Sequence, residues 1–288
     1  MTVWLISFAA AAVALAAGIY YLACRVHACP LVAALSRRTR VGGWVVSFAV
    51  ILLAAAVSVL LLNAVNTAVI LLHLVFFMLV SSLVGKIIIC VCGKAARFHL
   101  SGVLALIITA AYLAAGAVSA YNVQRTAYSV STHKEVGSLR VAMFADSHVG
   151  ATFGGKGFAK RMEELRSQQP DIVLIVGDFV DERTTREDMV ESCRALGKLE
   201  VPYGVWFVFG NHDKGLYGTS RGYDGDDLVR ELEANGVHVL QDENVLIDDR
   251  FYLVGRKDAS EQEETRGGRA DISDLTASLD PDKYSIVL

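Results

Sequence analysis

The first 121 residues contain no aspartate or glutamate, which is the most informative absence in this 288-residue chain. All 30 acidic residues follow that segment, together with 20 of the 27 lysines and arginines. The first part therefore carries a net charge of +7 and the second −10, although the formal total is only −3. Such a strong asymmetry predicts two physically different parts rather than one globular domain.

Cysteine is scarce in the acidic part, where Cys193 is the only one of the chain's five. A single thiol cannot build a disulfide framework, so we expect Cys193 to pack as a small apolar side chain. Cys90 and Cys92 lie two residues apart in an apolar run without a second pair, which favours packing over a zinc site. The acidic part also lacks the basic stripe that binds a polyanion, which argues against a nucleic-acid partner.

Long hydrophobic runs dominate the first part. A helix needs about 20 mostly apolar residues to cross a bilayer, and four segments meet this requirement, at 3–24, 44–62, 68–91 and 100–121. No basic residue precedes the first segment and three more segments follow it, so we expect a retained span rather than a cleaved signal peptide. We predict a four-helix transmembrane anchor over 1–121, in contact with membrane lipid, and a linker over 122–138.

Lysine and arginine predict the orientation of the spans, because short cytoplasmic loops are rich in both. The loops at 25–43 and 93–99 are basic, whereas the turn at 63–66 is uncharged. The basic loop residues are Arg25, Arg37, Arg38, Arg40, Lys94 and Arg97. We therefore expect a multi-pass protein of the cell membrane with its acidic part on the extracytoplasmic side. Basic residues at 125, 134 and 140 weaken this contrast and leave the opposite orientation open.

After residue 138, short β-branched runs alternate with amphipathic helical runs, the pattern of an α/β sheet domain. We expect strands at 139–144, 171–176, 205–209, 237–240, 245–247, 251–254 and 284–288, and helices at 158–167, from 184, and at 226–234. The helix from Thr184 is expected to open with a capping box completed by Glu187. The polar segment at 256–269 is expected to be a solvated loop.

Three polar clusters follow directly after three of the expected strands. They are Asp146-Ser147-His148, Gly177-Asp178-Phe179-Val180-Asp181 and Gly210-Asn211-His212-Asp213. The carboxyl ends of strands in an α/β sheet meet at one crevice, so these clusters can form a single site. Carboxylates, imidazoles and an amide without a thiolate suit a hard or borderline divalent metal. Each cluster alone could equally be a turn, and the ordered set of three is what favours a metal site.

These ordered motifs, Asp146-x-His148, Gly177-Asp178-x-x-Asp181 and Gly210-Asn211-His212-Asp213, resemble those of the calcineurin-like metallophosphoesterase superfamily. The resemblance covers residues 139–288 and extends to the membrane-anchored bacterial members of the superfamily. It implies a layered β-sandwich flanked by helices, which hydrolyses phosphate esters with two divalent metal ions such as Mn, Fe or Zn. The expected architecture is a four-span α-helical anchor followed by an α/β metallophosphoesterase domain.

The resemblance also implies a role for each motif residue. The implied metal ligands are Asp146 and His148 for the first ion, Asn211 for the second, and Asp178 as the bridge between them. His212 would act at the scissile phosphate as a proton donor or charge stabiliser, with Asp181 orienting its ring. This is chemically consistent, because two bridged cations acidify a water and clamp a phosphate, and a carboxylate on an imidazole fixes its tautomer.

Two features depart from the family pattern. Glu182 and Asp213 stand where the superfamily's protein serine/threonine phosphatases have Arg and Glu, which disfavours a protein phosphatase. The family also takes metal-binding histidines from later strands, one of them in Gly-His-x-His, whereas no histidine follows His238 here. His238 itself is expected to pack within a strand. We therefore expect a partial domain over 139–288, incomplete at its C-terminus, with weakened metal binding.

Two functions of different classes remain open. One is metal-dependent hydrolysis of a phosphate monoester or diester at the outer membrane surface, where the tether favours a lipid-linked substrate. The other is a catalytically degenerate membrane protein whose phosphoesterase-like domain binds a ligand or partner. A gene that continues beyond Leu288 into a histidine-containing strand and a Gly-His-x-His motif would support the enzyme.

Overall fold

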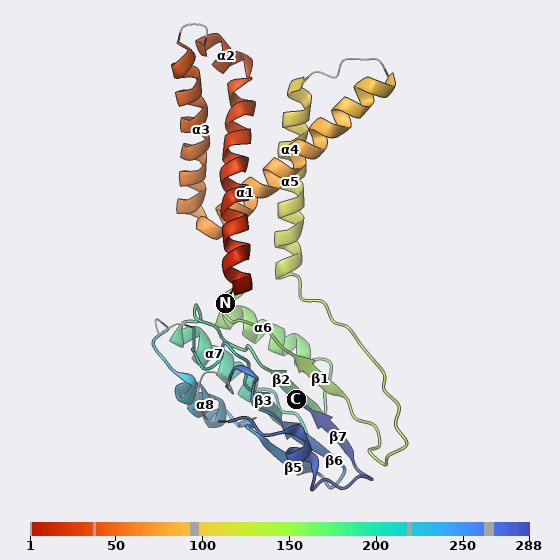
Figure 1. The fold of residues 1–288 in the computed structure, drawn as a ribbon. Coiled ribbons are helices and arrows are strands. Elements are labelled where there is room, and N and C mark those ends of the chain that lie inside the picture. The colour runs from red at the N-terminus through yellow and green to blue at the C-terminus, as the bar shows by residue number, and fades with distance from the viewer. Residues whose placement is uncertain (1, 37–38, 93–97, 218–220, 262–267) are drawn as a thin grey trace. The chain divides into compact units, whose positions relative to one another are not determined.

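The computed structural model describes residues 2–36, 39–92, 98–217, 221–261 and 268–288. The chain forms two compact units, Met1–Val123 and Gln124–Leu288, which are drawn in Figure 1. Four of the arginines and lysines used to predict orientation lie outside the described residues, namely Arg37, Arg38, Lys94 and Arg97. Residues 262–267 of the expected polar loop also lie outside them.

The first unit is built from five helices in its described residues. They are α1 (Thr2–His27), α2 (Pro30–Ser36), α3 (Arg40–Leu61), α4 (Ala64–Cys92) and α5 (Phe98–Tyr121). All except the short α2 are long and apolar enough to cross a membrane, with a mean hydropathy of 2.0 to 2.7 over each span. Large apolar side chains such as Trp4 and Leu60 are 71% and 85% exposed. Helices that are apolar all round suit a lipid surrounding, and the prediction of four span-length helices is confirmed.

Polar side chains in this unit bond to neighbouring helical groups, as buried polar groups in an apolar medium require. Thr67 Oγ1 of α4 donates to Ser58 Oγ of α3 at 2.9 Å, and Arg25 of α1 donates to Ser101 Oγ of α5 at 3.1 Å. His73 Nδ1 donates a 2.8 Å hydrogen bond to Val69 O within its own helix. The first two contacts link pairs of helices, whereas the His73 contact stays within α4.

The second unit begins with a parallel four-stranded sheet in the order β1-β2-β3-β4. Its strands are β1 (Val141–Phe144), β2 (Ile172–Val176), β3 (Val205–Val208) and β4 (Val237–Val239), connected by α6 (Gly155–Arg166), α7 (Arg186–Gly197) and α8 (Gly225–Ala234). Side chains alternate between the two faces of a strand. Val173 and Phe207 accordingly join the helix-side core with Phe158 and Cys193. The expected α/β layering and the buried Cys193 are both confirmed.

The opposite face of this sheet packs on a second, three-stranded sheet. Its strands are β5 (Glu243–Ile247), β6 (Phe251–Gly255) and β7 (Tyr284–Val287), with β5 antiparallel and β7 parallel to β6. Leu174 and Trp206 of the first sheet share a core with Phe251 and Leu253 of the second. The short α10 (Ile272–Thr276) precedes β7. The unit is therefore a two-sheet sandwich with helices on one side, and β2 and β3 contribute side chains to both cores.

The segment predicted as a linker is held by the second unit over its last residues. Val136 is buried in the core between the two sheets, and its carbonyl accepts a hydrogen bond from Arg250 Nε at 3.1 Å. Arg250 Nη2 also donates to Ser138 O at 3.3 Å. Lys134 Nζ donates to Lys283 O at 2.9 Å. This part of the chain is thus attached to the domain rather than free.

One expected helix start is wrong by a residue. Helix α7 begins at Arg186 with Thr185 as its N-cap, whose hydroxyl accepts from Asp188 N at 3.1 Å. Thr184 is instead fully buried, and its hydroxyl accepts from Asp181 N at 2.8 Å and donates to Val149 O. The sequence could not distinguish the two threonines, because a tertiary contact to another loop decides which hydroxyl is free to cap the helix.

Candidate metal centre

The predicted site residues lie on three loops that leave the carboxyl ends of β1, β2 and β3. The first two loops stay paired beyond the sheet, since Asp146 N donates to Gly177 O at 3.1 Å and His148 N donates to Asp178 O at 3.0 Å. Gly177 N in turn donates to Val208 O at 3.0 Å. The backbone therefore places the first two polar clusters side by side, with the third on the next strand of the sheet.

Two glycines let the second and third loops approach each other. Gly177 has φ of +75°, and a Cβ on it would lie 2.8 Å from Gly210 Cα. A Cβ on Gly210 would lie 2.2 Å from Asp178 Oδ1. Any side chain at either position would push the loops apart, so the glycines of both motifs serve this close backbone contact.

Asp146, His148 and Asp178 also have positive φ angles, of 52°, 37° and 52°. This left-handed region is uncommon for residues other than glycine, although Asp and His enter it more readily than most. Strained backbone of this kind persists where the surrounding structure holds it, and it clusters at functional sites. Here it accompanies the convergence of three potential ligands.

The three side chains form a group that could hold a cation. One ligand atom from each of Asp146, His148 and Asp178 lies within 4.8 Å of the others. His148 Nε2 is 3.9 Å from Asp146 Oδ1 and 3.8 Å from Asp178 Oδ2. These distances exceed a hydrogen bond, yet two ligands of one ion at about 2.1 Å each can lie up to about 4.2 Å apart. Two carboxylates and an imidazole with this spacing fit a divalent metal.

The group is open to solvent on one side. The Asp146 side chain is 74% exposed, against 28% for His148 and 14% for Asp178. An ion held there would have two ligands fixed in the protein and one at the surface. Phosphate from solution could therefore reach the same position.

Asp181 lies beside His148. Its Oδ2 is 3.7 Å from His148 Nδ1, a buried nitrogen without a hydrogen-bond partner among the described residues. The other oxygen, Oδ1, accepts from the backbone amides of Arg183 at 2.8 Å and Thr184 at 3.1 Å. Asp181 thus shapes the turn after the second motif and faces the imidazole of the metal group.

His212 is held by Glu182 rather than by the predicted Asp181. Its Nδ1 lies 3.0 Å from both carboxylate oxygens of Glu182. The His212 ring meets the His148 ring edge-on at 5.1 Å, and its backbone amide donates to Asp178 Oδ1 at 3.0 Å. The expectation that Asp181 orients His212 is therefore corrected. Because Asp181 Oδ1 is bound into the turn, the next residue along supplies the carboxylate.

Asn211 and Tyr217 lie at the rim of the site. Asn211 precedes His212 on the third loop, and its Nδ2 donates to Tyr217 Oη at 3.5 Å. The Tyr217 ring lies 5.1 Å from that of His212 and is about half exposed. Tyr217 had no signal in the sequence because it lies in no motif.

The Asp213 carboxylate joins the second and third loops by accepting hydrogen bonds from their backbone amides. It is fully buried, and its Oδ2 accepts from the amides of Asp178 and Gly210, both at 2.8 Å, while Oδ1 accepts from Val180 N at 3.0 Å. Burial raises the pKa of the Asp213 carboxyl to about 7, and the nearby charge of Asp178 adds to this, against the lowering effect of the three amides. Sequence reasoning placed Asp213 in the motif but did not predict this inward role.

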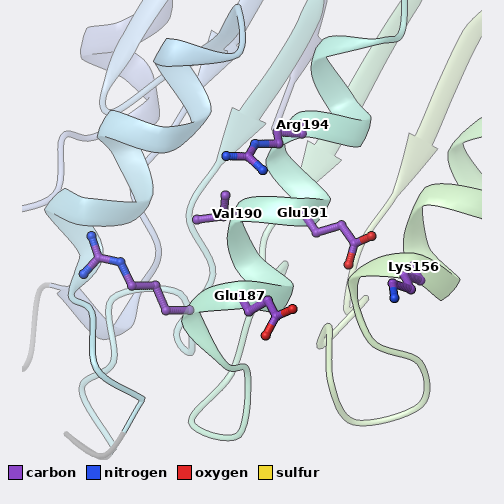
Figure 2. A pocket seen from close by; sticks show the side chains of 6 residues that line it. Lys156, Glu187, Val190, Glu191 and Arg194 are labelled. Atoms are coloured by element: carbon purple, nitrogen blue, oxygen red, sulfur yellow. The ribbon is translucent and has the colours of Figure 1, made fainter.

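A groove of about 490 Å³ lies elsewhere, on the exposed surface of α6 and α7. Figure 2 shows its lining, in which side chains of both charges surround one valine. The residues are Lys156, Arg186, Glu187, Val190, Glu191 and Arg194. None of them belongs to the three motifs, and the mixed charge gives the groove no preference for an anion.

His238 lies in β4 as expected and stacks on Trp206 at 4.3 Å, outside the metal group.

The three motifs lie in a part of the chain that resembles known proteins. Residues 139–277 match the family model for calcineurin-like phosphoesterases. A protein of Danio rerio named transmembrane protein with metallophosphoesterase domain is 31% identical over 115 residues, which cover 38% of this chain and 26% of that protein. Its Bos taurus counterpart of the same name is 28% identical over 158 residues, covering 54% and 34%.

A bacterial relative has a similar extent of match. The uncharacterized metallophosphoesterase YkoQ of Bacillus subtilis (strain 168) is 38% identical over 90 residues, which cover 31% of this chain and 32% of that protein. The chain therefore spans about a quarter to a third of the length of these curated relatives.

Proposed function

We propose that the chain hydrolyses phosphate monoesters or diesters with a dinuclear metal centre, because its residues 139–277 match the family model for calcineurin-like phosphoesterases. One observation carries the proposal. Asp146, His148 and Asp178 of this domain converge to within 4.8 Å at the strand ends. The four span-length helices of the first unit support a membrane location.

We assign the metal ligands by motif and by contact. Asp146, His148 and Asp178 would hold one divalent ion, and Asn211 would serve a second ion next to Asp178. Mn, Fe and Zn all suit this set of oxygen and imidazole ligands. When bound, such ions polarise the phosphate and acidify a water at neutral pH.

His212 would transfer the proton to the leaving group. With Nδ1 donating to the Glu182 carboxylate, only the doubly protonated ring carries a proton on Nε2, and this is the proton that would pass to the leaving oxygen of the ester. The Glu182 carboxylate would orient the ring in this role. Asp181, facing His148 at 3.7 Å, would position that ligand.

The Glu182→Gln variant tests this assignment. We expect kcat for an alkyl phosphate ester to fall about 10- to 100-fold, as for other changes to partners of functional histidines. Nitrophenyl esters should lose less activity, because their leaving group needs little protonation. The measurement is the ratio of kcat values for the two esters, with Glu187→Gln on the surface of α7 as the control. An equal loss for both esters would show that Glu182 does not act through leaving-group protonation.

The proposed activity is tested directly with the full chain in detergent. Protein stripped with a chelator and then supplied with Mn²⁺ should hydrolyse p-nitrophenyl phosphate or bis(p-nitrophenyl) phosphate. The preferred ester tells whether the enzyme is a monoesterase or a diesterase. Hydrolysis that is unaffected by stripping, or none after Mn²⁺ is restored, would contradict the proposal and favour a degenerate domain that only binds a ligand.

We further propose that the domain lies on the extracytoplasmic side, where a lipid-linked phosphate would be within its reach. A chain without native cysteines and with Tyr128→Cys should react with an impermeant maleimide in intact cells, since Tyr128 is 87% exposed. Arg38→Cys, in a predicted cytoplasmic loop, serves as the matched control and should react only after permeabilisation. The reverse pattern would place the domain in the cytoplasm.

A further inference from the structure

Arg221 lies buried against the backbone of the loop that carries His212. It is only 6% exposed. Its Nη1 donates to His212 O at 3.3 Å, its Nη2 to Asp213 O at 2.5 Å, and its Nε to Tyr223 O at 3.2 Å. The guanidinium therefore bonds three carbonyls at once, two of them in the third motif.

The loop is folded around this guanidinium. The carbon Cζ lies 4.4 Å from the centre of the Tyr223 ring, which covers one part of the group. Gly215, with φ of +72°, lies against another part of the guanidinium. A Cβ at this position would come within 2.9 Å of Nη2 and 3.0 Å of Cζ, so a side chain would not fit. Gly215 N also donates to His212 O at 3.0 Å. Residues 212–215 thus enclose the guanidinium and bond to it.

These contacts complete the fixation of His212. Its amide nitrogen is held by Asp178 Oδ1 and its carbonyl by Arg221. The next residue, Asp213, is held at its carbonyl by the same arginine. From this fixed backbone the His212 ring lies between Glu182 and the His148 ring.

The chemistry of the contact argues for positioning rather than for stability alone. In the part of the chain that the structure describes, Arg221 makes no ion pair. A buried cation without a paired carboxylate costs solvation energy, and here three backbone carbonyl oxygens take the place of the carboxylate. A guanidinium offers five donors in one plane, which a lysine cannot replace. The arrangement is suited to holding several carbonyls in fixed relative positions.

We propose that Arg221 is a positioning residue, which acts through the backbone of His212 and Asp213 to set the His212 ring for proton transfer. The effect on turnover rests on the function proposed above. The effect on the ring does not, because the contacts exist within the chain itself.

Arg250 provides a matched control for this proposal. Its guanidinium also donates to backbone carbonyls, those of Val136 and Ser138, and it also lies near a tyrosine ring, 5.6 Å from Tyr203. That contact lies between β6 and the start of the domain and includes no residue of the three motifs. Replacing either arginine removes hydrogen bonds to backbone carbonyls, but of the two only Arg221 bonds the carbonyl of His212.

The test compares Arg221→Ala, Arg221→Lys and Arg250→Ala in the full chain. We expect Arg221→Ala to lower kcat about 10- to 100-fold, as for a shift of about 1 Å in a catalytic group, with Mn²⁺ affinity and KM unchanged. Arg221→Lys, which keeps the charge but not the planar donors, should lose kcat as well. Methylguanidinium should restore part of the activity of Arg221→Ala, whereas Arg250→Ala should keep the kcat of the folded protein.

A second readout needs neither metal nor substrate. In chain labelled with ¹³C-histidine, the ring signal of His212, assigned with His212→Gln, should shift in both Arg221 variants and stay in place in Arg250→Ala. An unshifted signal in the Arg221 variants would overturn the proposal even if hydrolysis is detected. A shifted signal in a chain that shows no hydrolysis would support the positioning role of Arg221 and would contradict only the proposed function.

Discussion

Replacing Asp178 with asparagine is expected to remove metal-stimulated hydrolysis, with a loss in kcat/KM on the order of 10³-fold or more. The reason is that Asp178, as the proposed bridging ligand, would contribute several kcal/mol to charge stabilisation in the transition state through the metal. Asparagine keeps the size of the side chain and can still accept the hydrogen bond from His212 N, which Asp178 Oδ1 accepts at 3.0 Å. What it lacks is the negative charge beside His148 Nε2.

The matched control is Asp249→Asn, a change of the same size on an exposed turn. Asp249 is 85% exposed and pairs with Lys283 at 2.7 Å, and surface pairs of this kind contribute little to stability. Its variant should hydrolyse nitrophenyl esters at the wild-type rate. If both variants were equally active with Mn²⁺, the metal would have to bind somewhere other than at Asp178.

Replacing Asp213 with alanine is expected to lower the free energy of unfolding of the second unit by at least about 3 kcal/mol. Three buried amides, those of Asp178, Val180 and Gly210, would lose their acceptor, and each unsatisfied buried group costs about 1 to 3 kcal/mol. Asparagine keeps one acceptor oxygen but directs an NH₂ group at the remaining donors. The Asp213→Asn variant should therefore fall between the wild type and alanine.

Cys193 offers the measurement for this prediction. Its thiol is fully buried, and burial, with a smaller effect of Glu231, raises its pKa far above the ordinary range. In a chain whose other four cysteines are replaced, Cys193 should react with a maleimide only when the second unit unfolds. Pulse labelling across a urea series then gives the free energy of unfolding. Identical urea midpoints for the wild type and Asp213→Ala would refute the role of Asp213.

The elements that position the site could be predicted because their patterns are local. Strands such as β2 (Ile172–Val176) are short apolar runs, and a strand buried on both faces must be apolar throughout. The polar clusters follow these strands directly, and parallel strand ends meet at one edge of a sheet. Sequence reasoning therefore brought Asp146, His148 and Asp178 together correctly.

The partners of the site residues could not be predicted, because they depend on which carboxylate oxygens already accept hydrogen bonds within their own loop. Asp181 was expected at His212, but one of its oxygens is bound by the amides of its own turn, and Glu182 takes that place. Arg221 bonds backbone carbonyls, which exist at every position and leave no pattern in the sequence. The same limit applies to Asp213, whose inward direction follows only from how two other loops pack around it.

The most direct test of the metal site measures Mn²⁺ binding and ester hydrolysis on the same samples of wild-type chain and Asp178→Asn. Free Mn²⁺ can be followed by electron paramagnetic resonance during a titration of chelator-stripped protein. The site described here predicts that the wild type binds Mn²⁺ and gains hydrolysis as it does so, and that the variant loses both together. A wild-type chain that binds no Mn²⁺, or a variant that binds and hydrolyses as the wild type does, would contradict it.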